Sequence, residues 1–149
     1  MKKSIVSSSF LQTKNIAKTL AEIVLGERQR RGATVIALVG ELGSGKTTFA
    51  QGFAKGLGIK ARILSPTFIL LKEFAIQHSF FRVFYHIDCY RLDNPAGELL
   101  RLGFKEIAAD PRNIVAVEWA DRIKKILPRD VLWVQLEHGC KNKRSITMR

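Results

Sequence analysis

The sequence predicts an α/β fold in which helices flank a central, mostly parallel sheet, with a β-hairpin near the C-terminus. Two observations carry this prediction: apolar runs of strand length alternate with segments of helical periodicity, and two of these runs are apolar on both faces. Strands of that kind lie inside parallel sheets that helices cover. No repeat, low-complexity tract or flexible linker divides the chain, so we expect residues 1–149 to form a single domain.

The first half of the chain alternates expected strands and helices. We expect a short strand at 4–8, a helix at 10–25, the buried strand TVIALV at 34–39 and a second helix from about Lys46 to Leu57. The apolar residues of the first helix are spaced roughly along one face: Phe10, Ile16, Leu20, Ile23 and Val24. That face is predicted to pack on the core.

The second half continues the alternation. The segments 68–74 and 82–88 are expected to be strands, and a helix follows with Asn94 as its N-cap and Pro95 in its first turn. The run IVAV, at 114–117, is another buried strand, and a helix over 119–127 ends before Pro128. The segments VLWVQLE and RSITM, separated by HGCKNK, predict the terminal hairpin.

The chain is strongly basic. Its 25 lysines and arginines outnumber 13 aspartates and glutamates, which leaves a net charge of +12 and favours anionic partners, nucleic acid first. These cations are scattered, in groups such as 28–31, 55–62, 122–125 and KNKR at 141–144. We therefore expect most of them to be solvated surface charge, with RNA contact by a subset as the alternative.

Other features exclude several classes of protein. No apolar run approaches 18 residues, so a membrane span is not expected. The start MKKSIVSSSF has no apolar stretch of signal-peptide length, and Cys89 and Cys140 lie far apart outside any C-x-x-C pattern. Neither a disulfide framework nor a zinc site is expected, and a reducing cytoplasm is the natural compartment.

The segment GELGSGKTT, at 40–48, predicts a phosphate-binding loop (P-loop). Gly40, Gly45, Lys46 and Thr47 match G-x-x-x-x-G-K-[ST] between a strand and a helix, which is the context that this motif requires. Glycines let the backbone wrap phosphates, and the N–H groups at 43–48 and the helix N-terminus attract anions. Lys46 is expected to reach the β- and γ-phosphates of ATP, and Thr47 to bind Mg²⁺. The expected nucleotide contacts in this loop are Gly40, Glu41, Leu42, Gly43, Ser44, Gly45, Lys46, Thr47 and Thr48.

A P-loop also needs an acid near the metal. In an open α/β sheet it follows a strand at the carboxyl end, and Asp88 and Glu118 both do so. The strand before Glu118 is uninterrupted and apolar, as a central strand should be, so we assign Glu118 to the Mg²⁺ site. Asp88 would then orient the attacking water or extend the metal shell, although it could equally be a helix or turn cap. Trp119, beside Glu118, is expected near the nucleotide or a partner.

The segment SPTF, at 65–68, is a further candidate. Pro66 fixes its own φ and keeps Ser65 out of the helical region, so a stiff, extended loop could present the Thr67 hydroxyl to a γ-phosphate. The alternative is that SPTF only starts a strand. The guanine motif N-K-x-D and the switch motif D-x-x-G are both missing from the sequence, which argues against a GTPase. A small-molecule kinase and a basic nucleic-acid-binding module remain alternatives.

Four motifs together resemble one family. GELGSGKTT, SPTF, YHIDCYRL and VEWA occur in the order and spacing of TsaE, a bacterial P-loop ATPase of the tRNA threonylcarbamoyladenosine (t6A) pathway. The likeness runs from about Thr13 to the final hairpin. The family loop usually has Asp and Ala where this chain has Glu41 and Ser44, and both positions contribute mainly backbone.

The resemblance implies roles for the matching positions. Lys46 and Thr47 would bind phosphate and Mg²⁺, with Glu118 as the second metal-linked acid. Asp88 would be needed for hydrolysis, 65–68 would act as a switch-like loop, and Thr13 would lie near the adenine. The family binds the TsaD and TsaB proteins, which modify adenosine 37 of tRNAs that read codons beginning with A. The resemblance therefore implies an ATPase that is weak alone, activated by partners, and in contact with tRNA only indirectly. Neither DNA nor a membrane is expected as a partner.

Overall fold

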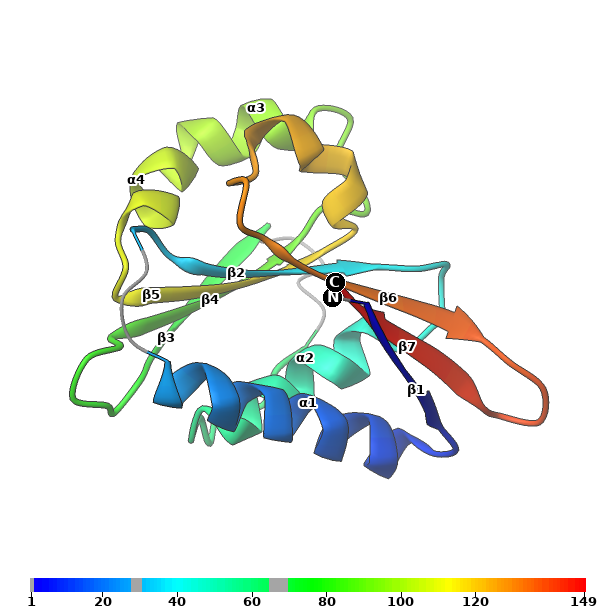
Figure 1. Ribbon diagram of the computed structural model, residues 1–149. Coiled ribbons are helices and arrows are strands. Elements are labelled where there is room, and N and C mark those ends of the chain that lie inside the picture. The colour runs from blue at the N-terminus through cyan, green and yellow to red at the C-terminus, as the bar shows by residue number, and fades with distance from the viewer. Residues whose placement is uncertain (1, 28–30, 65–69) are drawn as a thin grey trace.

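The computed structural model describes residues 2–27, 31–64 and 70–149, and within them seven strands form one sheet (Figure 1). The strands are β1 (Lys3–Ser7), β2 (Thr34–Val39), β3 (Leu71–Ala75), β4 (Val83–Asp88), β5 (Asn113–Glu118), β6 (Leu132–His138) and β7 (Arg144–Met148). The helices are α1 (Phe10–Gly26), α2 (Lys46–Gly56), α3 (Pro95–Arg101), α4 (Phe104–Ala109) and the 3₁₀ helix η1 (Ala120–Ile126).

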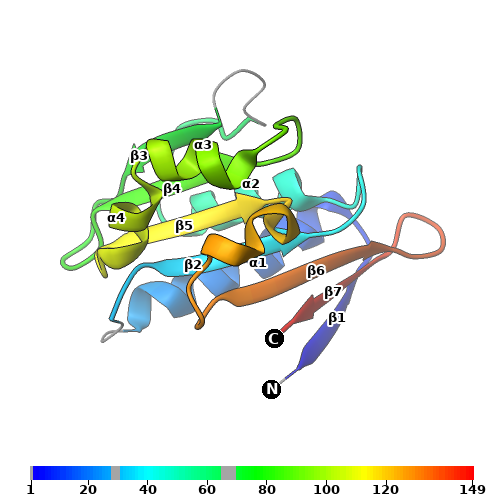
Figure 2. The same cartoon turned by 90° about the horizontal axis from the view of Figure 1, so that it is seen from above.

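The sheet has a parallel centre and antiparallel edges. Its strand order is β1-β7-β6-β2-β5-β4-β3, in which β6, β2, β5 and β4 pair in parallel. The hairpin β6–β7 carries β1 on one edge, and β3 pairs antiparallel with β4 on the other (Figure 2). This arrangement confirms the predicted α/β class, the mostly parallel centre and the terminal hairpin.

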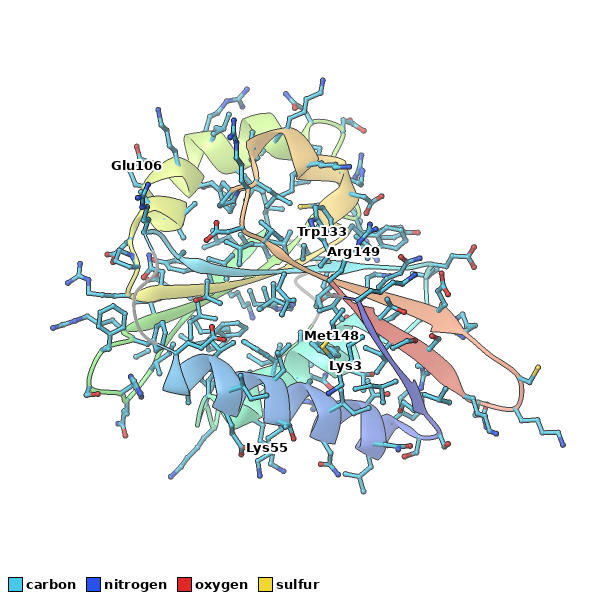
Figure 3. The ribbon with its side chains drawn as sticks, in the orientation of Figure 1. Lys3, Lys55, Glu106, Trp133, Met148 and Arg149 are labelled. Atoms are coloured by element: carbon cyan, nitrogen blue, oxygen red, sulfur yellow. The ribbon has the colours of Figure 1, made fainter. Side chains whose placement is uncertain are left out.

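Helices cover both faces of the sheet (Figure 1). One hydrophobic cluster joins α1 and α2 to one face, and a second joins α3, α4 and η1 to the other. Both layers between sheet and helices are filled with side chains, whereas long charged side chains such as Lys55 extend outward (Figure 3). β5 lies between β2 and β4 with all six residues buried, as expected of a strand that is apolar on both faces.

The predicted core face of α1 is partly wrong. Its buried residues are Thr13, Ala17, Ala21 and Val24, whereas Phe10 and Ile23 are 62% and 55% exposed. The reason is close helix packing, because α1 lies against the glycines of α2. A Cβ atom on Gly52 would lie 2.3 Å from the Lys14 carbonyl oxygen, so only small residues fit at this contact.

Two other elements differ from prediction. The segment after Asn94 forms two short helices, since Gly103 adopts a left-handed φ of +86° and ends the first helical stretch. The predicted N-cap is confirmed, because the Asn94 side chain accepts a hydrogen bond from the Gly97 N–H. The expected helix over 119–127 is a 3₁₀ helix with a kink at Ile123. No helix in the described ranges is long and apolar enough to cross a membrane.

Candidate nucleotide-binding site

The loop between β2 and α2 has the backbone that a phosphate-binding loop requires. Gly40, Gly43 and Gly45 have φ values of +150°, +77° and +105°, where residues with a Cβ are strained. At Gly40 a Cβ would also lie 2.3 Å from the Leu136 carbonyl oxygen. The loop leaves the carboxyl end of a central parallel strand and enters the N-terminus of α2 at Lys46, where backbone N–H groups attract anions.

Lys46 is held close to the loop. Its side chain is only 5% exposed, and its Nζ donates hydrogen bonds to the carbonyl oxygens of Gly40 (2.6 Å) and Glu41 (2.8 Å). The ammonium group also lies 3.9 Å from the ring centre of Trp119. Burial lowers the Lys46 pKa from its ordinary value, while the negative charges of Glu118, Asp88 and Asp121 act against that shift. The cation therefore sits at the P-loop in an acidic, aromatic setting.

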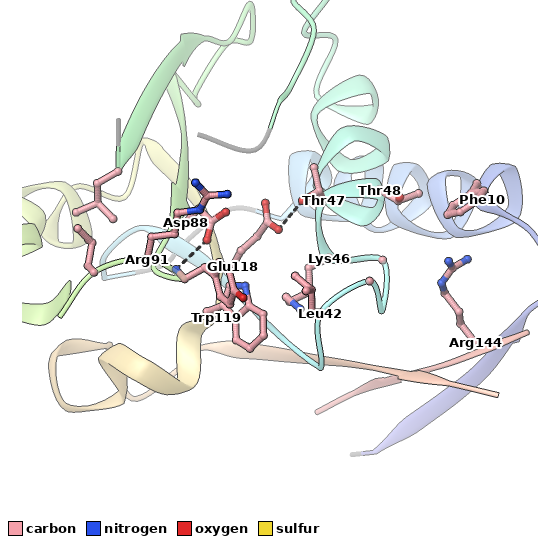
Figure 4. A pocket seen from close by; sticks show the side chains of 15 residues that line it. Phe10, Leu42, Lys46, Thr47, Thr48, Asp88, Arg91, Glu118, Trp119 and Arg144 are labelled. Atoms are coloured by element: carbon pink, nitrogen blue, oxygen red, sulfur yellow. Dashed lines mark hydrogen bonds between the residues drawn. The ribbon is translucent and has the colours of Figure 1, made fainter. Parts of the chain in front are cut away.

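The two candidate acids end neighbouring strands and differ in their surroundings. Asp88 and Glu118 are register partners on β4 and β5. Glu118 is 2% exposed, and its Oε1 accepts a 2.7 Å hydrogen bond from the Thr47 hydroxyl (Figure 4). Its Oε2 lies 2.6 Å from His86 Nε2. Asp88 is half-buried, and its Oδ1 accepts a hydrogen bond from the Tyr90 N–H. The predicted turn-cap contact of Asp88 is thus present, and its carboxylate also lines the pocket.

A pocket of about 470 Å³ opens beside these residues (Figure 4). Its lining includes Leu42, Gly43, Gly45, Lys46, Thr47, Thr48, Asp88, Glu118 and Trp119, together with Phe10, Leu70, Tyr90, Arg91, Leu92 and Arg144. Its size suits a small organic ligand, and its polar groups converge from the P-loop and two strand ends. The sequence predicted this convergence of the P-loop with both acids.

Phe10 and Arg144 line the pocket although neither was predicted there. The Arg144 guanidinium lies 4.4 Å from the Phe10 ring centre, and the side chain is 8% exposed. Its Nε has no hydrogen-bond partner among the described residues. Most of the cations were expected to be solvated, and Arg144 is an exception, because hairpin alternation turns this residue inward beside Gly45.

The remaining predicted residues have different positions. Gly40 and Glu41 line a second pocket, which shares Trp119 with the first, and Ser44 is buried. Thr13 is fully buried, exchanges a 2.7 Å hydrogen bond with the Ser7 hydroxyl, and is not part of the pocket lining. Its hydroxyl thus ties α1 to β1. Thr67 and the rest of 65–69 lie outside the described residues.

Trp119 lines both pockets. It adopts a left-handed φ of 57°, which is uncommon for a bulky residue, and its ring stacks on Tyr90 with 4.8 Å between ring centres. The Lys46 ammonium lies over this ring, so Trp119 is next to the P-loop, and its expected place near the nucleotide or a partner stays a prediction. The strained backbone at this residue turns the chain from β5 into η1.

Comparison with known proteins identifies similar sequences and a similar structure. The sequence profile described as "Threonylcarbamoyl adenosine biosynthesis protein TsaE" matches residues 7–146. Proteins named "tRNA threonylcarbamoyladenosine biosynthesis protein TsaE" are 35% identical in Bacillus subtilis (91% of this chain, 78% of that protein) and 40% identical in a Nostoc species (82% and 73%). A third, from Aquifex aeolicus, is 32% identical over 97% of this chain and 93% of its own length. The crystal structure of B. subtilis YdiB superposes with a TM-score of 0.77 at 30% identity, over 99% of this chain and 84% of that one.

Proposed function

Because the chain belongs to the TsaE family of tRNA threonylcarbamoyladenosine biosynthesis proteins, we propose that it is the Mg²⁺-dependent ATPase subunit of that modification. It would act with the TsaD and TsaB proteins in forming t6A at position 37 of tRNAs that read codons beginning with A. The observation that carries this proposal is the 2.7 Å hydrogen bond between Thr47 and Glu118, which joins the P-loop helix to the end of a central strand inside the pocket.

The residues of the pocket fit a Mg²⁺–ATP complex. Mg²⁺ prefers oxygen ligands and usually keeps several waters beside one or two protein groups and substrate phosphates. Thr47 would bind the ion directly and Glu118 through water. No cluster of three or more histidine, cysteine or acidic side chains capable of holding a metal occurs in the described ranges, so nucleotide oxygens would complete the coordination. Bound Mg²⁺ would neutralise charge on the β- and γ-phosphates.

The hydrolytic roles are divided among Lys46, Asp88 and the loop at 65–68. Lys46 would exchange its bonds with the Gly40 and Glu41 carbonyls for the β- and γ-phosphate oxygens. Asp88, which lines the pocket and is less buried than Glu118, would orient the attacking water. Thr67 is proposed to sense the γ-phosphate. Phosphate passes to water in this scheme, so no acceptor site is needed.

The nucleotide base would lie toward Phe10 and Arg144. These residues occupy the pocket together with Thr48, across the P-loop from the acids (Figure 4). A guanidinium that already stacks on an aromatic ring offers a flat, cationic surface, on which a purine can stack. Thr13, which the family resemblance puts near the adenine, is one turn along α1 from Phe10, and its hydroxyl is bonded to Ser7, so its proposed place is behind the base.

The rim of the pocket supports a partner-dependent activity. Leu42, Phe10 and Tyr90 are 69%, 62% and 44% exposed around one opening. Apolar side chains gathered at a functional opening are typical of protein interaction sites. TsaD and TsaB would cover this rim and raise a weak intrinsic hydrolysis, with tRNA contacted through them in the cytoplasm.

Phosphate release from ATP tests the proposal. The protein is assayed alone and with TsaD and TsaB, each with Mg²⁺ and with EDTA, and Lys46→Ala is the control. We expect Mg²⁺-dependent release that partners increase and Lys46→Ala abolishes. Transfer of phosphate to an added metabolite would instead indicate a small-molecule kinase. Tight tRNA binding that does not depend on ATP and is retained by the Lys46→Ala variant would indicate a nucleic-acid-binding module.

A further inference from the structure

His86 is a fully buried histidine that reaches the site from β4. It lies two residues before Asp88, so strand alternation places both side chains on the face of the sheet that carries the P-loop helix. In the register of β4 with β5, His86 is opposite Ala116 and Asp88 is opposite Glu118. His86 therefore lies two residues farther from the carboxyl end of the strands than the two acids do. Its Nε2 is 2.6 Å from Glu118 Oε2.

The surroundings of the ring define which nitrogen carries the proton. Nδ1 has no hydrogen-bond partner within the described residues, so a proton there would be a buried donor without an acceptor. The same tautomer would also turn the lone pair of Nε2 toward a carboxylate oxygen. A proton on Nε2 removes both conflicts. His86 is accordingly assigned as the donor to Glu118 from the hydrogen-bond network.

This bond fixes both oxygens of Glu118. Oε2 accepts from His86, and Oε1 accepts from the Thr47 hydroxyl at 2.7 Å. The terminal torsion of a glutamate is broad, so a carboxylate held at one oxygen only can turn. With His86 in place, Oε1 stays directed at Thr47. Three elements, β4, β5 and α2, are joined through one carboxylate.

We propose that His86 is a positioning residue that holds the Glu118 carboxylate so that Glu118 aligns the Thr47 hydroxyl for Mg²⁺. This inference rests on the proposed function, in which Thr47 binds the ion. Partners that orient a metal site from outside the ligand shell typically change metal affinity by 10–100-fold when they are removed. Glu118 then keeps its hydrogen bond with Thr47, and Asp88 is the acid that orients the attacking water.

The test measures metal dependence without turnover. ADP binding is titrated by calorimetry at a series of Mg²⁺ concentrations and in EDTA, for the wild type and for His86→Leu, His86→Gln and Phe84→Leu. Leucine removes the donor, whereas glutamine places an amide N–H near the position of Nε2. Phe84 is the matched control, because it is fully buried on the same strand and face but packs on Phe53 and Phe74.

We expect His86→Leu to need at least about tenfold more Mg²⁺ than the wild type for the same gain in ADP affinity. Its ADP binding in EDTA should equal that of the wild type, and Gln should restore the Mg²⁺ dependence. Phe84→Leu should lower the melting temperature without moving that dependence. If His86→Leu does not fold, His86→Asn, whose amide is too short to reach Oε2, takes its place with the same expectation.

Two results would overturn the proposal. One is an unchanged Mg²⁺ requirement in the folded variant that lacks the donor, and the other is a glutamine variant as defective as leucine. Both leave the proposed ATPase standing. Absence of any Mg²⁺-dependent ADP binding by the wild type is a different failure, which would remove the proposed function and this inference together.

Discussion

The two sides of the pocket differ in how deeply their side chains are buried. The inner side, formed by Lys46, Thr47, Glu118 and His86, is buried except for the half-buried Thr47; Lys46 donates to backbone carbonyls of the P-loop, and Glu118 bonds to Thr47 and His86. The outer side, formed by Phe10, Leu42, Asp88 and Tyr90, is half-buried or exposed. In the proposed function, the inner side holds phosphate and metal, and the outer side receives water and protein partners.

The largest expected effect is at the inner side. Lys46→Ala removes the cation proposed to contact the β- and γ-phosphates, so nucleotide should no longer stabilise the protein. In a melting scan with Mg²⁺–ATP at 100 dissociation constants, the wild type should gain roughly 2.7 kcal/mol. Comparable stabilisation of the variant would contradict the phosphate-loop assignment. Lys55→Ala, an exposed lysine at the other end of the same helix, is the control.

The two acids should respond unequally to removal even without nucleotide. Glu118→Ala leaves the buried His86 donor without its acceptor, and we expect a loss of about 2 kcal/mol in the free energy of unfolding. Asp88→Ala, at a half-buried position, should cost less than about 1 kcal/mol. Urea unfolding of the wild type and both variants measures these losses in the free energy of unfolding. Equal losses would show that the buried and open acids are not distinct in their structural roles.

A smaller effect is expected on the base side. Arg144→Met keeps a side chain of similar length against Phe10 but removes the flat cation. Affinity for ATP should fall by about tenfold, in keeping with a contact worth 1–2 kcal/mol. Affinity for inorganic tripolyphosphate should be unchanged. If tripolyphosphate binding falls as far as ATP binding, Arg144 belongs to the phosphates and the base must lie elsewhere.

The sequence predicted which residues gather at the inner side better than it predicted the contacts between them. An apolar run before Glu118 and a glycine-rich loop before Lys46 were enough to place the P-loop beside both acids, because parallel strands end at one edge of the sheet. The bond between His86 and Glu118 could not be predicted, since it depends on the register of β4 with β5. The pattern H-I-D did carry a signal, because two polar residues spaced by two share one strand face.

The outer side was predicted less well for a packing reason. Phe10 was assigned to the core because large apolar residues dominate helical periodicity. In the structure, small residues of α1 make the core contact, since Gly52 and Gly56 of α2 bring the two helices close together. Arg144 was one of the scattered cations, most of which were expected to be solvated surface charge. The pairing of β7 with β6 sets which way its side chain points, and composition carries no information on that.

The central claim is that the inner side binds the nucleotide while Asp88 serves hydrolysis. Its most direct test is Asp88→Asn, which retains an oxygen to accept from the Tyr90 N–H but loses the charge. ADP affinity and phosphate release are measured on the same preparation, with Mg²⁺, TsaD and TsaB present. We expect ADP affinity within about twofold of the wild type and phosphate release reduced at least a hundredfold, the lower range for loss of a general base. Wild-type phosphate release by this variant, or loss of ADP binding in step with loss of release, would contradict the claim.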